Sequence, residues 1–487
     1  MHKKTILELH DDLINNRVTH KQLFDSSVKH VEKIKQTLNS INSYCPIDNL
    51  EDLKIDNYLA GIPYIMKDLV ATKNILTTSS SRILEEFVPM YSATIYERLL
   101  AKQALMVAKS NLDEYGMGGT NMNSIHGFTR NPYNTQKGTG GSSGGSAALV
   151  AAGCVPFAIG TDTGDSVRKP AAYCGIYGFK PTWSVIPRYG VFPYASSCDQ
   201  VGVFSRCVAD IAIVLETLNG ADKNDPTSLI HEKENFYQNL ETNQKPLKIG
   251  YLKELIDSFD NEVVIQQFQE TVDYLKSLNH EIVEISINKD LLKCVRGCYH
   301  VVVNSEASSN LGNLTGIAFG HRVSKDDTTD SIFATRSFGL SKFTKARLAI
   351  GAMSLKKGNR EQYFIAAQKI RSLFVDTYAD IFKEIDILMA PCANSGAINP
   401  ETEKAIGNED AQLIAENHLS LTNLIGAPGI TIPTHFYEGL PYAMSFMSKP
   451  FNDQMLLNFA KQFEVGLQAG KFKNLQSFYN VYVEEVK

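Results

Sequence analysis

Short hydrophobic runs alternate with amphipathic stretches along most of the chain. Eight runs have the length and composition of buried strands: 61–66, 105–108, 155–160, 247–252, 282–287, 385–390, 429–433 and 442–447. Between them, apolar residues recur at helical spacing, as at Val264, Phe268, Val272 and Leu275, which places one apolar stripe on a helix. Strands alternating with helices predict an α/β fold whose sheet is covered on both faces.

Two amphipathic stretches, 6–15 and 21–36, precede the first expected strand. They predict two helices, the second capped by Thr19, and we interpret residues 1–40 as an N-terminal helical arm. The most polar stretches are expected to be surface loops or insertion boundaries rather than linkers: 221–244, 324–330 and 400–410.

The composition narrows the function further. The formal net charge is -5 with 21% charged residues. This charge argues against a surface that binds nucleic acid or anionic lipid and favours a small substrate. We find no secretory signal and no run long enough to span a membrane. The eight cysteines are scattered without zinc-ligand spacing, so we expect reduced thiols, no metal site and a cytoplasmic protein.

The segment 138–146 is the most unusual part of the chain because it consists almost entirely of Gly and Ser. A flexible linker is one interpretation, but this segment leads directly into a small-residue stretch typical of a tightly packed helix. A phosphate-binding loop would need a following Gly-Lys-Ser/Thr, which the chain lacks here. The remaining interpretation is a loop that presents Ser142 or Ser143 at the start of a helix.

A second segment, 160–170, follows the expected strand at 155–160. A turn after a strand would expose Ser166 beside successive backbone N–H groups, which is the arrangement that an oxyanion hole requires. The triplet at 162–164, Asp-Thr-Gly, also occurs in aspartic proteases, where two carboxylates share a proton. Only one such triplet is present, so we favour the serine.

A serine nucleophile needs a base, and none of the 11 histidines lies in these segments. Lys67 ends the apolar run at 61–66, and burial there would favour its neutral form, which can accept a proton. Taken alone, a lysine at a strand end is usually an exposed surface residue. The functional interpretation of Lys67 therefore depends on its neighbours.

Five blocks, in this order, resemble the amidase signature family. They are Gly61-Ile-Pro with Lys67-Asp68, Ser110-Asn-Leu-Asp-Glu-Tyr-Gly-Met-Gly118, Gly140-Gly-Ser-Ser-Gly-Gly-Ser146, Gly160-Thr-Asp-Thr-Gly164 with Ser166-Val-Arg168, and Cys174-Gly-Ile-Tyr-Gly-Phe-Lys-Pro-Thr182. The resemblance implies a large twisted mixed β-sheet sandwiched between layers of α-helices. It also implies a single amidase domain over residues 1–487, with a more divergent region at about 221–400 packed on the same sheet.

The resemblance assigns a role to each candidate residue. It implies a Ser-cisSer-Lys triad in which Ser166 attacks an amide and Ser142 relays the proton to Lys67. Its oxyanion hole would be formed by Thr163, Gly164 and Asp165, although the family usually has Gly at the position of Asp165. Three positions match the substrate-binding residues of the family: Arg371, Glu416 and Phe319, of which the last two replace the usual Asp and Tyr.

Within the family, three further segments are most similar to the glutaminase subunits of aminoacyl-tRNA amidotransferases: Arg188-Tyr-Gly190, Ala195-Ser-Ser-Cys-Asp-Gln-Val-Gly202 and Asn423-Leu-Ile-Gly-Ala-Pro428. This branch implies glutamine as the substrate, partner subunits B and C, tRNA bound mainly through the partner, and ATP and Mg on the partner subunit, with no cofactor in this chain. Two alternatives stay open: a stand-alone amidase that acts on another small amide, and a structural subunit whose catalysis Asp165 has weakened.

Overall fold

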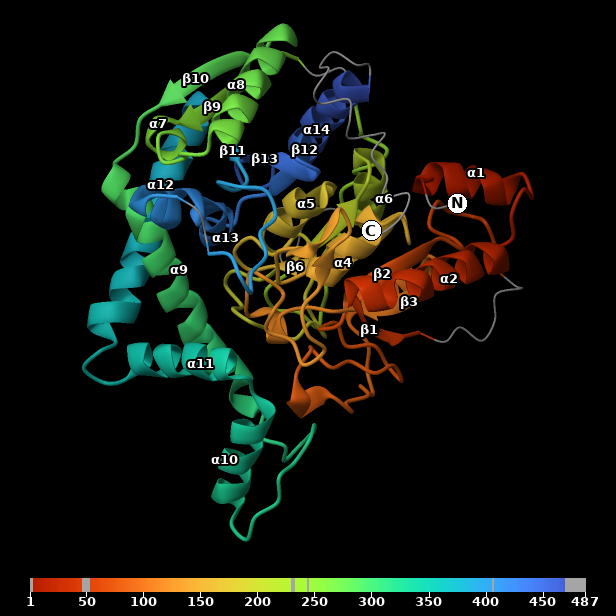
Figure 1. Ribbon diagram of the computed structural model, residues 1–487, viewed down its shortest axis with the longest axis vertical. Helices are drawn as coiled ribbons and strands as arrows, with labels where there is room; N and C mark the ends of the chain where they lie inside the picture. The colour runs from red at the N-terminus through yellow and green to blue at the C-terminus, as the bar shows by residue number, and fades with distance from the viewer. Residues whose placement is uncertain (1–2, 46–52, 229–232, 243–244, 405–406, 469–487) are drawn as a thin grey trace.

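The computed structural model describes residues 3–45, 53–228, 233–242, 245–404 and 407–468. Figure 1 shows helices arranged around a central sheet, with α10 protruding from the body. Parts of two predicted loops, 229–232 and 243–244 in the first and 405–406 in the second, lie outside the described residues. So do residues 1–2 of the predicted arm and the stretch 469–487 of the predicted domain.

One mixed sheet of 11 strands runs through the protein in the order β1-β3-β2-β6-β8-β7-β12-β13-β11-β9-β10. The strands are β1 (Ile41–Tyr44), β2 (Pro63–Lys67), β3 (Leu105–Ser110), β6 (Phe157–Asp162), β7 (Tyr177–Lys180), β8 (Gln200–Ser205), β9 (Lys248–Leu252), β10 (Glu281–Ile285), β11 (Ile387–Pro391), β12 (Gly429–Tyr437) and β13 (Leu440–Ser448), while β4 (Arg130–Asn131) and β5 (Asn134–Gly138) form a small separate sheet. The edge strand β1 pairs antiparallel with β3. The next pairs, β3–β2 and β2–β6, are parallel, as are β11–β9 and β9–β10 at the other end of the sheet, and the pairs between these two groups are antiparallel.

Helices cover both faces of this sheet. They are α1 (Ile6–Ile14), α2 (His20–Leu38), α3 (Thr94–Ala101), α4 (Gly144–Ala151), α5 (Arg168–Cys174), α6 (Val208–Leu218), α7 (Lys253–Ile256), α8 (Glu262–Ser277), α9 (Lys289–Asn310), α10 (Thr328–Gly339), α11 (Lys342–Leu355), α12 (Ala366–Glu384), α13 (Leu421–Leu424) and α14 (Asp453–Gln468). The predicted α/β sandwich is confirmed. No helix of the described part combines the length and the apolar character needed to cross a membrane.

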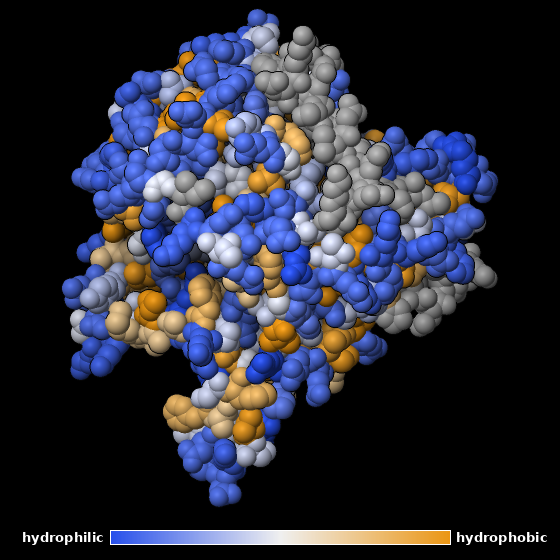
Figure 2. Space-filling model, viewed as in Figure 1, coloured by the Kyte–Doolittle hydropathy of each residue, from blue (hydrophilic) through white to orange (hydrophobic). Residues whose placement is uncertain are grey.

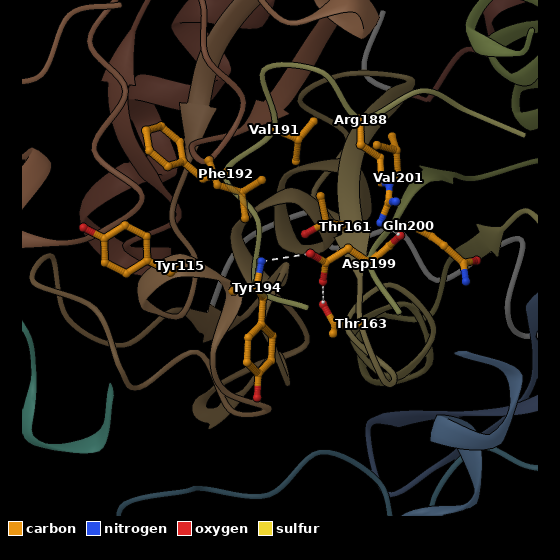
Figure 3. Close-up of a pocket in the computed structure, with 12 residues that line it drawn as sticks. Tyr115, Thr161, Thr163, Arg188, Val191, Phe192, Tyr194, Asp199, Gln200 and Val201 are labelled. Carbon is orange, nitrogen blue, oxygen red and sulfur yellow. Dashed lines mark hydrogen bonds between the residues drawn. The ribbon is translucent and has the colours of Figure 1, made fainter. Parts of the chain in front are cut away.

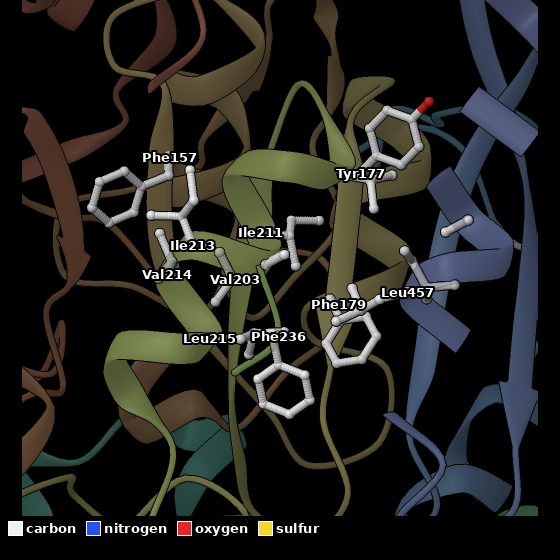
Figure 4. Packing of buried hydrophobic residues seen from close by; sticks show 14 of the residues in the cluster. Phe157, Tyr177, Phe179, Val203, Ile211, Ile213, Val214, Leu215, Phe236 and Leu457 are labelled. Carbon is white, nitrogen blue, oxygen red and sulfur yellow. The ribbon is translucent and has the colours of Figure 1, made fainter. Parts of the chain in front are cut away.

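The alternation of side chains along each strand explains why both faces need a cover. On β2 and β6, Tyr64 and Phe157 point into one hydrophobic core, whereas Ile65 and Ala158 belong to another. Figure 4 shows the first core, where apolar residues of α6 and α14 pack against the central strands. Helices α2, α4 and α5 contribute to the second core on the opposite face.

The predicted helices and strands agree with most of these elements. Each of the eight predicted strands overlaps an observed strand, and Thr19 caps α2 through a capping box with Gln22. The polar stretch 324–330 is only partly a loop, because Asp327 accepts hydrogen bonds from the first backbone N–H groups of α10, which begins at Thr328.

The surface is largely hydrophilic on the face shown in Figure 2, but apolar residues gather around α10. Phe333 and Phe338 on this helix are 67% and 47% exposed, and Phe343 on α11 is 43% exposed. All eight cysteines are free, and all but Cys294 are buried, which agrees with the expected reduced thiols.

Candidate active site

Lys67 lies at the end of β2, and its ammonium group reaches the two loops that carry the candidate serines. Its Nζ lies 2.7 Å from Oγ of Ser142 and 2.7 Å from Oγ of Ser143. A third hydroxyl, Oγ1 of Thr161 on β6, lies 2.9 Å away. The structure therefore places Lys67 in direct hydrogen-bond contact with Ser142, as the sequence predicts.

The protonation of Lys67 is set mainly by its burial. The side chain is fully buried, and desolvation lowers its pKa to about 7, although Asp113, Asp162 and Asp199 favour the charged form. A neutral fraction of Lys67 is thus present near pH 7 and can accept a proton. The alternative of an exposed surface lysine is wrong, because β2 is buried along its whole length.

The glycine-rich segment forms a tight turn immediately before α4. The peptide bond between Gly141 and Ser142 is cis, and residues 138–146 are all buried, so the interpretation as a flexible linker is wrong. Ser143 is tied to β6, since its hydroxyl donates to the Thr161 carbonyl at 3.0 Å and accepts the Thr161 N–H at 3.3 Å. Ser142 lacks such a tie among the described residues, and its hydroxyl is therefore the better placed for a proton relay.

Ser166 lies on the turn between β6 and α5 and is buried, with 3% of its surface exposed. A buried ion pair fixes this turn: Asp162 accepts from Nη2 of Arg168 at 3.0 Å and from the Val167 N–H at 2.9 Å. Arg168 also donates to the Gly164 carbonyl at 2.6 Å. Within the described residues no hydrogen bond joins the hydroxyl of Ser166 to Ser142 or Lys67, so this last step of the relay stays a prediction.

The ion pair also removes the aspartic-protease alternative. Burial alone would raise the pKa of Asp162, but the charge of Arg168 and its hydrogen bonds lower it overall. A carboxylate that is paired in this way does not share a proton with a second carboxylate.

The backbone of residues 163–165 is available for an oxyanion. Among the described residues, none of the N–H groups of Thr163, Gly164 and Asp165 has a hydrogen-bond acceptor in the protein. Unpaired N–H groups next to a nucleophile are what an oxyanion hole offers. The assignment of these three residues remains a prediction, now with a geometric basis.

Asp165, which stands where the family usually has Gly, directly precedes the candidate nucleophile Ser166. Its backbone is not among the residues with positive φ, so the turn does not require glycine there. Burial raises its pKa to about 6, while the charge of Lys169 opposes this shift. Arg168 is paired with Asp162, and Asp165 consequently lacks the guanidinium partner that could have neutralised it.

A small internal cavity of about 10 Å³, close to the volume that one water requires, lies beside the candidate oxyanion hole. Figure 3 shows Asp199 at its wall, where it accepts the Thr163 hydroxyl at 2.7 Å and the Tyr194 N–H at 2.8 Å. Burial raises the pKa of Asp199 to about 6. Asp199 thereby orients Thr163, a role that the sequence did not suggest.

The three predicted substrate-binding residues lie in different surroundings. Arg371 donates through Nη1 to the Ser197 hydroxyl at 2.7 Å and through Nε to the Leu424 carbonyl at 2.7 Å. Phe319 lines a separate surface hollow and packs against Phe87 at 5.5 Å between ring centroids.

Glu416 forms an ion pair with Lys169 at 2.5 Å. No hydrogen bond, ion pair or ring contact within the described part of the chain joins Arg371, Glu416 and Phe319 to one another, and their roles stay predictions.

Two further residues that shape the site were not singled out by the sequence. Thr161 shares the Lys67 contact with Ser142 and Ser143, and Asp113 lies near enough to affect the pKa of Lys67. Asp113 and Thr161 lie inside the recognised blocks, but their types alone do not distinguish a supporting role from a catalytic one. Over the described residues, no group of three or more His, Cys, Asp or Glu side chains is arranged to hold a metal ion.

Comparisons with known proteins extend this picture. The profile of the amidase family matches residues 22–457. The chain is 36% identical over 482 residues to the A subunit of glutamyl-tRNA(Gln) amidotransferase from Thermoanaerobacter pseudethanolicus, with 97% of each chain covered. A protein of the same name from Staphylococcus aureus is 38% identical over 432 residues, which cover 88% of this chain and 87% of the relative.

Solved structures agree with the sequence comparisons. The crystal structure of the A subunit of glutamyl-tRNA(Gln) amidotransferase from Thermotoga maritima is 28% identical, with a TM-score of 0.79 over 95% of this chain and 94% of the other. The peptide amidase from Stenotrophomonas maltophilia, at 23% identity, shares the fold with a TM-score of 0.80 over 95% and 96% of the two chains.

Proposed function

Because the chain belongs to the amidase family, we propose that it is the glutaminase subunit of a glutamyl-tRNA(Gln) amidotransferase. In this role it hydrolyses the side-chain amide of glutamine and releases ammonia for transamidation of Glu-tRNA(Gln). The observation that carries the proposal is the 2.7 Å contact between buried Lys67 and Ser142, because it supplies a base without any histidine. The names of relatives that align over nearly the whole chain support the choice of substrate.

The proposed chemistry proceeds through an acyl-enzyme. Oγ of Ser166 attacks the amide carbon while its proton passes through Ser142 to neutral Lys67. The N–H groups of residues 163–165 stabilise the negative oxygen of the tetrahedral intermediate. The intermediate collapses when the proton returns to the nitrogen, and ammonia leaves. Water then attacks the acyl-enzyme by the reverse proton route and releases glutamate.

The proposal includes partners for the second half of the reaction. We assign ATP and Mg to a partner subunit, because ammonia can join Glu-tRNA only after the glutamyl carboxyl is activated. Subunits B and C are the expected partners, and tRNA is expected to bind mainly through them. The formal net charge of -5 supports this division of labour, since a tRNA-binding surface is usually basic. A cytoplasmic location follows from this role.

The test is ammonia release from glutamine by the purified chain, with and without co-expressed partner subunits. Ser166→Ala and Lys67→Met are each expected to lower kcat by about 10⁴- to 10⁶-fold, as removal of a member of a catalytic serine unit does.

Ser146→Ala is the matched control, because this buried serine bonds Ser110 and the Ile159 carbonyl but not Lys67. Its turnover is expected to stay within a few-fold of wild type. Unchanged turnover of Ser166→Ala would reject the mechanism, and a better rate on an uncharged amide than on glutamine would reject the substrate.

A further inference from the structure

A tyrosine from a distant helix covers the turn that holds the candidate oxyanion hole. Tyr299 lies on α9, and a Cβ added to Gly164 would lie 2.7 Å from both Cζ and Oη of its side chain, closer than real Cβ atoms approach another heavy atom. Gly164 is not among the residues with positive φ, so its backbone conformation does not require glycine. The phenol group of Tyr299 is therefore the reason that position 164 needs one.

The hydroxyl of Tyr299 lies beside the backbone N–H groups that are available to an oxyanion. The N–H group of Gly164 and the Cβ that this residue lacks share the same Cα, so an atom 2.7 Å from the Cβ position lies next to this N–H group. An oxyanion lies about 2.7–3.1 Å from each of its donors. The hydroxyl can therefore reach an oxygen that the N–H groups of residues 163–165 bind.

The protein itself makes no use of this hydroxyl. Tyr299 packs against the surrounding apolar core and contacts the ring of His300 at 5.4 Å between centroids, but within the described part of the chain its hydroxyl has no hydrogen-bond partner. Tyr194, which lies near enough to affect the pKa of Tyr299, differs in this respect. Its hydroxyl donates to Oδ1 of Asn304 at 3.2 Å and accepts from Nη1 of Arg347 at 2.8 Å. The hydroxyl of Tyr299 is thus left for a ligand.

Tyr299 keeps its proton at neutral pH and is a hydrogen-bond donor. Burial raises the pKa of Tyr299 above its ordinary value because it penalises the phenolate, and Tyr194 and Asp165 raise this pKa further. Arg347 opposes the shift without reversing it. A neutral phenol donates one hydrogen bond, and it does so without adding a buried charge to the turn.

We propose that Tyr299 is a further catalytic residue, whose O–H donates a hydrogen bond to the oxygen of the tetrahedral intermediate at Ser166. When Oγ of Ser166 adds to the amide carbon, the electron pair of the C=O bond moves onto the oxygen, and the hydroxyl stabilises that charge together with the backbone N–H groups. When the pair returns, the C–N bond breaks and ammonia leaves. The phenol keeps its own proton throughout. The inference rests on the proposed function, because it takes amide hydrolysis through Ser166 as given.

The first test is Tyr299→Phe, which removes the hydroxyl but keeps the ring over Gly164. With co-expressed partner subunits, kcat for ammonia release from glutamine is expected to fall by about 10²-fold, as it does when one oxyanion donor is lost. KM and the melting temperature should stay nearly unchanged. Tyr378→Phe is the matched control, because the hydroxyl of this buried tyrosine on α12 also lacks a partner among the described residues. Its kcat should equal that of wild type.

A second measurement compares a tetrahedral ligand with a planar one. The aldehyde 5-oxopentanoate, in which CHO replaces the amide, adds to Oγ of Ser166 and forms a tetrahedral adduct, whereas glutamine bound to the Ser166→Ala chain keeps its planar amide. Tyr299→Phe is expected to weaken inhibition by the aldehyde by about tenfold or more and to leave the calorimetric affinity for glutamine within about twofold. A tyrosine that only packed over the turn would affect both ligands equally or neither.

Wild-type kcat in Tyr299→Phe, or an equal effect on aldehyde and glutamine, would overturn the inference. A failure of the proposed function looks different, because wild type would then hydrolyse another amide in place of glutamine. The hydroxyl acts on the carbonyl oxygen that all amides share, so the ratio of kcat between wild type and Tyr299→Phe on that amide would still decide the inference. A wild-type chain that hydrolysed no amide would overturn both.

Discussion

Lys67 holds its proton less tightly than an exposed lysine does, because desolvation lowers its pKa to about 7. The neutral amine is the active base, and it predominates above this pKa. We therefore expect kcat/KM for glutamine, measured in Asp165→Asn so that the titration of Asp165 does not overlap, to rise about tenfold per pH unit below about pH 7 and to level off above it. Initial rates of ammonia release over this range measure the profile. A midpoint near 10, where an exposed lysine titrates, would contradict the proposed role.

Asp165 places a carboxyl group next to the oxyanion hole, and burial raises its pKa to about 6. Above that pH the carboxylate is charged and opposes the negative charge that develops in the transition state. Asp165→Asn is expected to raise kcat at pH 8 by about tenfold, which corresponds to ~1.4 kcal/mol. At pH 5, where Asp165 is protonated, the two proteins should differ little. If wild type and Asp165→Asn had equal kcat at pH 8 as well as at pH 5, the Asp165 carboxylate would have to point away from the reacting atoms.

At the level of single residues, the sequence predicts the site residues that lie within its motifs. Lys67 and Ser142 were identified from their blocks, and the structure places them in contact. The contact between Asp199 and Thr163 was not predicted, because the two residues are 36 positions apart and only the fold brings them together. Without the family resemblance, the residues alone did not distinguish Ser142 from Ser143, since the structural difference lies in which hydroxyl bonds to β6.

Among the structural elements, the turn between β6 and α5 depends on the ion pair between Asp162 and Arg168, both of which are fully buried. Arg168→Met leaves Asp162 as an uncompensated buried charge, and we expect the free energy of unfolding to fall by about 3–5 kcal/mol. Chemical denaturation measures this change. The matched control is Lys21→Met, which removes an exposed pair with Asp25 on α2 and should cost about 0.3–0.5 kcal/mol.

Two of the strands that sequence analysis missed, β7 and β8, share a physical reason. β7 and β8 are buried along their whole lengths, yet they contain Gly178, Lys180, Gln200 and Gly202 and so lack a continuous apolar run. Lys180 is accommodated because it donates to Gln200 at 2.5 Å and to the carbonyl of Ala427. Such partners belong to the tertiary structure, and a pattern of hydrophobic positions does not contain them.

For the whole molecule, the alternation of strands and helices was enough to predict the layers but not the strand order. The sheet places β6, which leads to Ser166, next to β2, which ends at Lys67. This adjacency creates the site, although the two strands are separated in the sequence by β3. Strand order depends on long-range pairing, whereas periodicity reports only local structure. The single domain over residues 1–487 stays a prediction.

The N-terminal arm contributes to the main core. Ile6, Leu9 and Leu13 on α1 are at most 3% exposed and belong to the core that α6 and α14 share, and the Ile6 N–H donates to Asp210 on α6 at 3.0 Å. Leu9→Ala is therefore expected to lower the free energy of unfolding by about 2–5 kcal/mol.

Ile14 on the same helix is 53% exposed, and Ile14→Ala should change the free energy of unfolding by less than about 0.5 kcal/mol. Denaturant unfolding of the two variants decides whether α1 is part of the cooperative fold. If the arm merely docked on the surface, both substitutions would change the free energy of unfolding by small and similar amounts. A much larger loss of unfolding free energy in Leu9→Ala than in Ile14→Ala would mean that α1 unfolds together with the rest of the fold. The packing of this first helix would then help to stabilise the sheet in which β2 and β6 form the site.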